Sequence, residues 1–158
     1  MIEKKLPFYF SIDFEDFYYD SLRALGKQDP GSKANDLYHS YEKIKKIQKK
    51  YLNSKPITFF VTGILAKKMP DLISKIHKDG NEIGCHYNFH DDINKCTRSE
   101  LAKNLDIAID NIYKITGEKP IGFRAPNFAI NDNDLWAYEE ISKRFKYDSS
   151  YKTSKKFE

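Results

Sequence analysis

The chain has 158 residues, 40% of them hydrophobic and 15% aromatic, which is enough for one sizeable core but not for two. No stretch approaches the roughly 18 uninterrupted apolar residues of a membrane span. The first residues are followed by acidic residues instead of the small-residue cleavage site of a signal peptide. We therefore expect one soluble, cytoplasmic domain over residues 1–158 with no membrane span. The net charge of +4 comes largely from lysines on the wet side of an expected helix, which argues against a nucleic-acid partner.

Short apolar strands alternate with amphipathic helices along the chain. The expected strands cover residues 8–13, 57–61, 82–85, 121–124 and, with a weaker pattern, 145–148. The expected helices cover residues 34–52, 63–79, 97–116 and 132–144, whereas residues 17–33 have no clean period and are expected to form a long loop. Helices of this length can connect parallel strands, so the pattern predicts an α/β fold whose sheet is either an open layer or part of a barrel.

Two of these helices carry clear start and stop signals. Thr97 and Glu100 have the spacing of a capping box, and the apolar stripe that follows them stops at Gly117. Pro70 suits the first turn of a helix that ends at Gly80.

Polar side chains follow the carboxyl ends of the expected strands, where parallel sheets gather their ligands. These side chains are Asp13, Glu15 and Asp16 after the first strand, His86 and His90 after the third, Arg124 after the fourth and Asp148 in the fifth. In the first strand apolar and polar residues alternate, so Asp13 and Glu15 project from one face and Asp16 points elsewhere. Acids after a strand also form turns, so this cluster alone favours a structural role slightly.

His86 and His90 form an HxxxH pair, whose imidazoles can share one divalent ion. On their own, two histidines are explained more readily by helix capping or simple surface placement than by metal binding. A carboxylate from the first strand would complete a facial set of two nitrogens and one oxygen. A structural zinc knuckle that adds Cys85 and Cys96 is disfavoured, because the adjacent Cys85 and His86 would point to opposite faces of a strand.

Arg124 lies where Pro126 forces a strand to turn. A lone arginine at a strand end usually faces solvent. If Asp13 and Asp148 lie close to it, the guanidinium would hold a carboxylate ionised and oriented.

The segments SIDFED, TFFVTG, NEIGCHYNFH, GFRAPNF and KYDSS, in this order, resemble the motifs of the polysaccharide deacetylase family, also called the NodB homology domain or carbohydrate esterase family 4. The likeness spans about residues 7 to 150. It implies an irregular (β/α) barrel that removes acetyl groups from N-acetylated carbohydrates with a divalent metal ion, zinc first and cobalt or manganese next. The family barrel commonly has more strands than the five expected here, so we expect an incomplete barrel and a C-terminally truncated chain.

The resemblance also implies roles for individual residues. His86 and His90 would bind the metal together with Glu15, for which Asp16 is the fallback, and Asp13 would act as the general base. Arg124, tethered by Asp148, would orient that base. The backbone N–H of Asn127 would bind the oxyanion, and Tyr18, with its neighbours Phe17 and Tyr19, would stack on sugar rings.

One part of the family pattern is missing, because no histidine follows His90 to serve as the late general acid. We therefore expect weak activity or none from this form. An inactive remnant that binds carbohydrate or a partner is the main alternative, and hydrolysis of a phosphate or cyclic amide at the same site is another. Unpaired sheet edges would also favour association into homo-oligomers.

Overall fold

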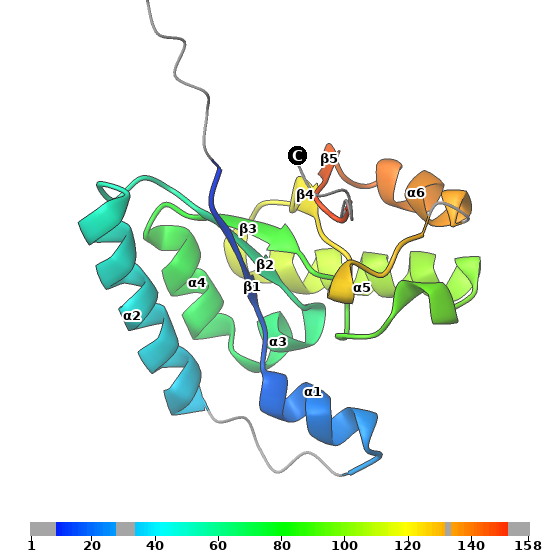
Figure 1. Cartoon of the computed structure of the whole chain (residues 1–158), viewed down its shortest axis with the longest axis horizontal. Helices are drawn as coiled ribbons and strands as arrows, with labels where there is room; N and C mark the ends of the chain where they lie inside the picture. Colours follow the sequence, from blue (N-terminus) through cyan, green and yellow to red (C-terminus); the bar gives the residue numbers. More distant parts are fainter. Residues whose placement is uncertain (1–8, 28–33, 132–133, 152–158) are drawn as a thin grey trace, which may run out of the picture.

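The computed structural model describes residues 9–27, 34–131 and 134–151 (Figure 1). The strands are β1 Ser11–Phe14, β2 Thr58–Val61, β3 Glu82–Cys85, β4 Gly122–Phe123 and β5 Tyr147–Asp148. The helices are α1 Phe17–Ala24, α2 Ala34–Tyr51, α3 Gly63–Lys68, α4 Pro70–Lys78, α5 Arg98–Thr116 and α6 Leu135–Ser142, with short 3-10 turns at Ile93–Lys95 and Pro126–Phe128. Within these residues no helix is both long and apolar enough to cross a bilayer.

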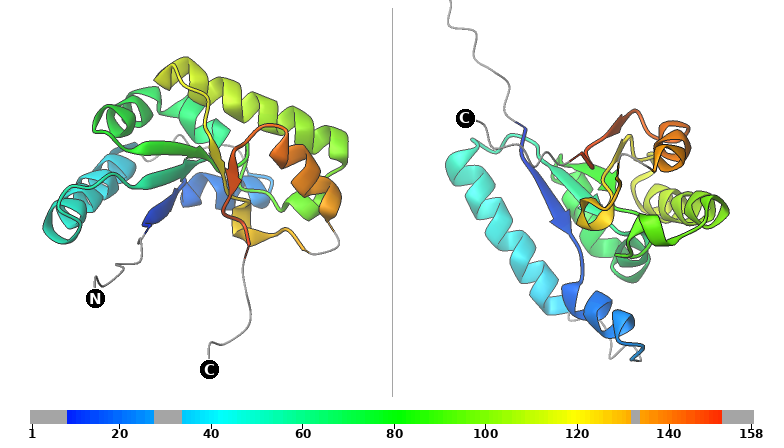
Figure 2. Two further views of the ribbon diagram at one scale, coloured as in Figure 1. Left: turned by 90° about the horizontal axis from the view of Figure 1, so that it is seen from above. Right: turned by 45° about the vertical axis from the view of Figure 1, so that its right-hand side comes forward.

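The five strands form one parallel sheet in the order β1-β2-β3-β4-β5, which confirms the predicted α/β class. Each strand pairs with the next one along the chain, and helices connect them, as parallel neighbours require. Helices α2 to α6 lie along one side of the sheet, whereas α1 lies beyond the carboxyl end of β1 (Figures 1 and 2). The carboxyl ends of all five strands therefore share one edge.

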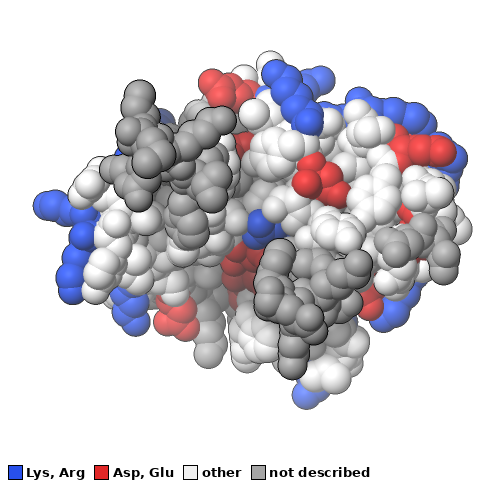
Figure 3. Space-filling model, turned by 45° about the horizontal axis from the view of Figure 1, so that its top comes forward, with Lys and Arg blue, Asp and Glu red and all other residues white. Residues whose placement is uncertain are grey.

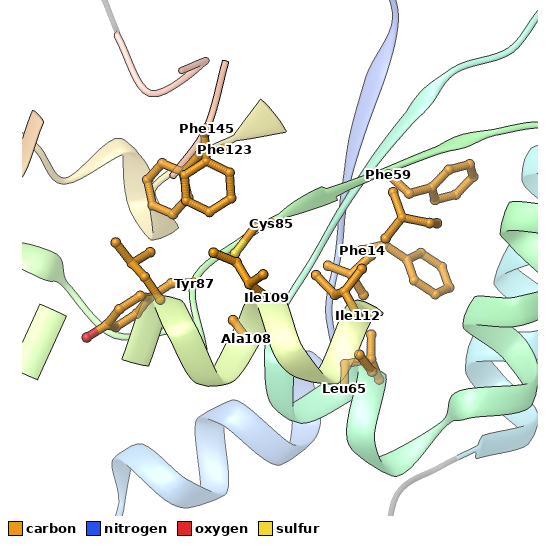
Figure 4. Close-up of a cluster of buried hydrophobic side chains, with 14 of the residues drawn as sticks. Phe14, Phe59, Leu65, Cys85, Tyr87, Ala108, Ile109, Ile112, Phe123 and Phe145 are labelled. Carbon is orange, nitrogen blue, oxygen red and sulfur yellow. The ribbon is translucent and has the colours of Figure 1, made fainter. Parts of the chain in front are cut away.

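The hydrophobic core lies between the sheet and the helices. Phe59, Cys85 and Phe123 are completely buried on the helix-covered side of the sheet, where Ala108 and Ile112 of α5 face them (Figure 4). Each buried side chain of the size of phenylalanine or isoleucine contributes about 1.5–3 kcal/mol. This packing fixes the strands whose ends carry the polar residues.

Gly63 allows α3 to lie directly against α5. A Cβ atom at this position would lie 2.7 Å from the Cα of Ala108, closer than non-bonded carbon atoms approach. A side chain there would push apart two of the helices that cover the core.

The opposite side of the sheet is largely polar. Glu82 accepts hydrogen bonds from Thr58 Oγ1 at 2.6 Å and from Tyr147 Oη at 2.8 Å. The Arg124 guanidinium lies 4.2 Å from the centre of the Phe60 ring. Figure 3 shows a hollow in the middle of the molecule where acidic and basic side chains meet. This side corresponds to the inside of the predicted barrel, and it leads to the carboxyl ends of the strands.

Most predicted elements are confirmed, and the signals for α5 are present in detail. Thr97 and Glu100 form the capping box, and Gly117 ends the helix with a φ of 76°. The helix predicted over residues 63–79 is instead two helices that meet at Met69. Met69 precedes Pro70 and has a φ of −129° and a ψ of 55°, because a proline ring disfavours the helical conformation of the residue before it.

The loop predicted over residues 17–33 is wrong in its first half, where α1 forms, and residues 28–33 lie outside the described part. Asp16 caps α1 by accepting a hydrogen bond from the Tyr19 backbone N–H at 3.0 Å. The helix buries Asp20, whereas Phe17 is 78% exposed. The apolar period therefore does not mark the buried side of α1, which is why it does not reveal the helix.

A charged contact between α2 and the end of α4 predicts that the folded protein loses stability in acid. Asp79 Oδ2 accepts a hydrogen bond from the buried Tyr41 hydroxyl at 2.6 Å and lies 2.9 Å from Lys45 Nζ. The Tyr41 hydrogen bond, followed by Lys45, lowers the Asp79 pKa from 3.8 to about 2. The stability that the carboxylate adds is present above pH 3.8 and is lost as the pH falls towards 2.

We expect Asp79→Asn to lower the free energy of unfolding at pH 7 by about 1 kcal/mol, a small value because part of the side chain faces solvent. Urea denaturation of both proteins at pH 7, 4 and 3 measures this. The difference should shrink below pH 4, and a constant difference at all three pH values would contradict the assignment.

Candidate metal centre and active site

The ends of β1 and β3 bring Glu15, His86 and His90 together. Phe14 pairs with Val61, and Val61 pairs with Cys85, so Glu15 and His86 leave their strands at the same level. One ligand atom from each of the three residues lies within 4.8 Å of those of the other two. In the described part of the chain this is the only such group of three histidine, cysteine or acidic residues. The three residues are those that the sequence predicts as ligands.

His86 is arranged as a metal ligand would be. It is 1% exposed, and its Nδ1 lies 2.8 Å from the Arg124 carbonyl oxygen. A carbonyl only accepts hydrogen bonds, so Nδ1 donates and Nε2 carries the free lone pair. Nε2 is buried and has no hydrogen-bond partner among the described residues. Burial also lowers the pKa of His86, which favours the neutral imidazole that a metal requires.

Glu15 and His90 complete the donor set. His90 Nε2 lies 2.9 Å from Glu15 Oε2, and the contact with this carboxylate raises the pKa of His90. The rings of His86 and His90 have centroids 5.4 Å apart. Two imidazoles and one carboxylate suit a borderline divalent cation and leave coordination positions open. The residues present therefore fit the metal ion that the family resemblance implies.

Asp13 lies beside this group and is held by Arg124. Arg124 Nη1 donates to Asp13 Oδ1 at 2.7 Å, and its Nη2 donates to the hydroxyls of Ser11 and Ser149, both at 2.8 Å. The Arg124 side chain is only 12% exposed. These hydrogen bonds fix the Arg124 guanidinium, so its contact with Asp13 holds that carboxyl group in one orientation.

The prediction that Asp148 holds Arg124 in place is wrong, because the neighbouring Ser149 does so. Arg124 is anchored by Ser149, through both the hydroxyl and the carbonyl oxygen, the latter at 3.3 Å from Nε. Asp148 instead accepts hydrogen bonds from the backbone N–H and hydroxyl of Ser150. Successive residues of a strand point to opposite sides, so Ser149 shares the side of Arg124 and Asp148 does not.

Asn127 lies in the turn after β4, on a pocket that also contains His90. Its φ of 56° is left-handed, and its side-chain amide donates to Asp92 Oδ1 at 2.9 Å. Non-glycine residues rarely adopt this conformation, although asparagine tolerates it better than most, and such strain often accompanies function. The role of its backbone N–H stays a prediction.

The aromatic residues expected to contact sugar lie on α1 instead of on a loop. Phe17 is 78% exposed and Tyr18 is 42% exposed, so both have surface available to a ligand. The Tyr19 ring lies against Lys68, whose Nζ is 3.3 Å from the ring centre, so Tyr19 packs within the protein. The role of Tyr18 in substrate binding stays a prediction.

The cysteine-containing zinc knuckle has no support in the described residues. Cys85 is buried in the core, where desolvation raises its pKa to about 12, and Cys96 Sγ donates to the Ile93 carbonyl oxygen at 3.0 Å. Neither cysteine belongs to the group of Glu15, His86 and His90.

Sequence reasoning missed two residues near the site, Asp20 and Arg23 of α1. Arg23 Nη2 donates to Asp91, and its guanidinium lies 4.9 Å from the centre of the Phe89 ring. The signal was present, because Asp16 is a good helix cap and Asp20 and Arg23 have ion-pair spacing on a helix.

Comparison with known proteins identifies the family. The family model for polysaccharide deacetylase matches residues 29–145. The peptidoglycan-N-acetylmuramic acid deacetylase PdaA of Bacillus subtilis is 39% identical over 62 residues, which are 39% of this chain and 24% of PdaA. The chain thus aligns with about a quarter of that relative's length.

Solved structures show the same fold. A variant of the peptidoglycan deacetylase PdaC from Bacillus subtilis has a TM-score of 0.54 and 30% identity, covering 65% of this chain and 46% of that one. A carbohydrate esterase family 4 pseudoenzyme from Bacillus anthracis has a TM-score of 0.60 and 21% identity, covering 66% of this chain and 36% of its own. These structural neighbours have the barrel-like (β/α) deacetylase fold, of which the five parallel strands here form a part. The chain belongs to the polysaccharide deacetylase family.

Proposed function

We propose that this chain hydrolyses N-acetyl groups on the amino sugars of a polysaccharide or its precursor, with a divalent cation held by Glu15, His86 and His90. The observation that carries the proposal is the buried Nε2 of His86, which has no hydrogen-bond partner among the described residues, in a side chain that offers a ligand atom within 4.8 Å of those of Glu15 and His90. Membership of the family and the relatives that deacetylate peptidoglycan support the reaction class. The donor set favours Zn²⁺, with Co²⁺ or Mn²⁺ as substitutes.

A bound divalent cation lowers the pKa of a water molecule and polarises a carbonyl oxygen. Asp13 accepts the proton of the attacking water, because the hydrogen bond from Arg124 at 2.7 Å orients its carboxyl group beside the site. The backbone N–H of Asn127 stabilises the oxyanion, and Tyr18 packs against a sugar ring of the substrate.

Protonation of the leaving amine is the weak step in this scheme. In these 158 residues no histidine follows His90, so the late histidine that the family resemblance implies is not among them. We therefore expect slow turnover. The same absence, together with the likeness to a pseudoenzyme, favours one second candidate, an inactive module that retains the metal site and binds carbohydrate.

The test is acetate release from N-acetylglucosamine oligomers by the purified chain, before and after chelation and with zinc restored. We expect slow release that chelation abolishes and zinc restores. Zinc and oligomer binding without any acetate would favour the inactive module, and release that survives chelation would contradict the proposed metal dependence. Parallel assays on a phosphate ester and a cyclic amide would detect hydrolysis of a different bond.

A further inference from the structure

The carboxyl group of Asp20 is buried next to the candidate metal centre and accepts no hydrogen bond from the part of the chain that the structure describes. Asp20 is 7% exposed, and neither of its carboxyl oxygens has a hydrogen-bond partner among the described residues. It pairs with Arg23, but the distance from Oδ1 to Nε is 3.9 Å, too long for a hydrogen bond. An unsatisfied buried polar group costs about 1–3 kcal/mol, so its presence requires an explanation.

The surroundings of Asp20 increase the free-energy cost of burying its carboxyl group. Burial and then the negative charge of Glu15 raise its pKa to about 6, and Asp16 adds to this effect. His90 and Arg23 act in the opposite direction but do not compensate. The ionised carboxylate of Asp20 is therefore disfavoured in the folded protein, first by burial and then by the charge of Glu15.

Arg23, one helical turn after Asp20, links α1 to the segment that carries His90. The Arg23 guanidinium donates to Asp91 and lies over the ring of Phe89, and both of these residues flank His90 in the chain. Arg23 thus fastens α1 to the segment that carries a metal ligand. This contact holds Asp20 beside the site in spite of its unfavourable environment.

Asp20 is not itself placed as a ligand. The group of ligand atoms that lie within 4.8 Å of one another contains Glu15, His86 and His90, and Asp20 is not part of it. Asp20 would therefore act on a bound cation through its charge and not by direct coordination.

We propose that Asp20 is a positioning residue for the metal centre, whose buried negative charge raises the affinity of the site for a divalent cation and lowers the stability of the metal-free protein. The inference rests on the metal site of the proposed function, but not on the hydrolysis. Groups outside the ligand set commonly change metal affinity by about 10- to 100-fold. A residue that served only the fold would stabilise the protein with or without metal, whereas Asp20 should act in opposite directions on stability and on affinity.

The test compares Asp20→Asn with the wild-type chain and with Asp110→Asn, a control that removes an exposed acid from α5. Zinc affinity is measured by competition with a chromophoric chelator, and the unfolding of the metal-free protein is measured in urea. We expect Asp20→Asn to bind zinc about 10- to 100-fold more weakly and to unfold at a higher urea concentration than the wild type. The Asp110→Asn variant should match the wild type in both measurements.

Unchanged zinc affinity in Asp20→Asn, or a metal-free variant less stable than the wild type, would overturn the inference. A wild-type chain that binds no zinc would overturn it together with the proposed metal site. A wild-type chain that binds zinc but releases no acetate would contradict only the hydrolysis, and the affinity comparison would still decide the role of Asp20.

Discussion

Asp13→Asn is expected to reduce acetate release by about 10²- to 10⁴-fold, the usual contribution of a general base. Asparagine keeps the shape of the side chain and can still accept the hydrogen bond from Arg124 through its amide oxygen, but it cannot take a proton from water. The measurement is the rate of acetate release from N-acetylglucosamine oligomers at saturating zinc. Zinc affinity, measured on the same preparation, should stay within a few-fold of the wild type, because Asp13 is not a ligand and, unlike Asp20, its carboxylate is paired with Arg124.

Asp71→Asn is the matched control, because it removes an exposed acid from the first turn of α4. Its rate and zinc affinity should equal those of the wild type. If Asp13→Asn retains the wild-type rate, another group is the base. If it instead loses zinc binding, Asp13 is a ligand and the roles of Asp13 and Glu15 must be revised.

Zinc is expected to raise the stability of the wild-type protein but not that of the His86→Gln variant. At a free zinc concentration about 100 times Kd, the free energy of unfolding should rise by about 2.7 kcal/mol. For a chain of this size the corresponding rise in Tm is roughly 5–10 °C. Glutamine retains an amide donor for the Arg124 carbonyl oxygen but lacks the imidazole lone pair. The metal-free variant should therefore fold, and its Tm should not respond to zinc.

Thermal unfolding with and without zinc provides the measurement, and His77→Gln provides the control. His77 lies in the last turn of α4 and outside the group of ligand atoms, so its replacement should preserve the full zinc response. An equal rise in Tm for wild type and His86→Gln would show that zinc binds elsewhere.

The family resemblance implied the metal centre, and strand parity selected Glu15 over Asp16 as its carboxylate ligand. Alternation along the first strand placed Asp13 and Glu15 on one face, and in the structure Glu15 joins the histidines while Asp16 caps α1. Both positions depend only on strand parity and on the turn that follows. The capping box of α5 is a similar local signal, as is the proline that separates α3 from α4.

Features that depend on long-range contacts could not be predicted in this way. Asp20 and Arg23 belong to a helix whose buried side carries a charge, so no apolar stripe reveals it. The anchor of Arg124 is Ser149 and not Asp148, which depends on the register of a strand only two residues long. Neither contact leaves a periodic pattern in the sequence.

Arg124 holds two residues of the site in place. Its side chain fixes Asp13, and its carbonyl oxygen fixes the ring of His86. The proposed proton acceptor and one proposed metal ligand are therefore both positioned by Arg124, directly after β4. Replacing the guanidinium would release only the acceptor. A backbone distortion at this point, for example from loss of Pro126 two residues later, would instead displace Asp13 and His86 together.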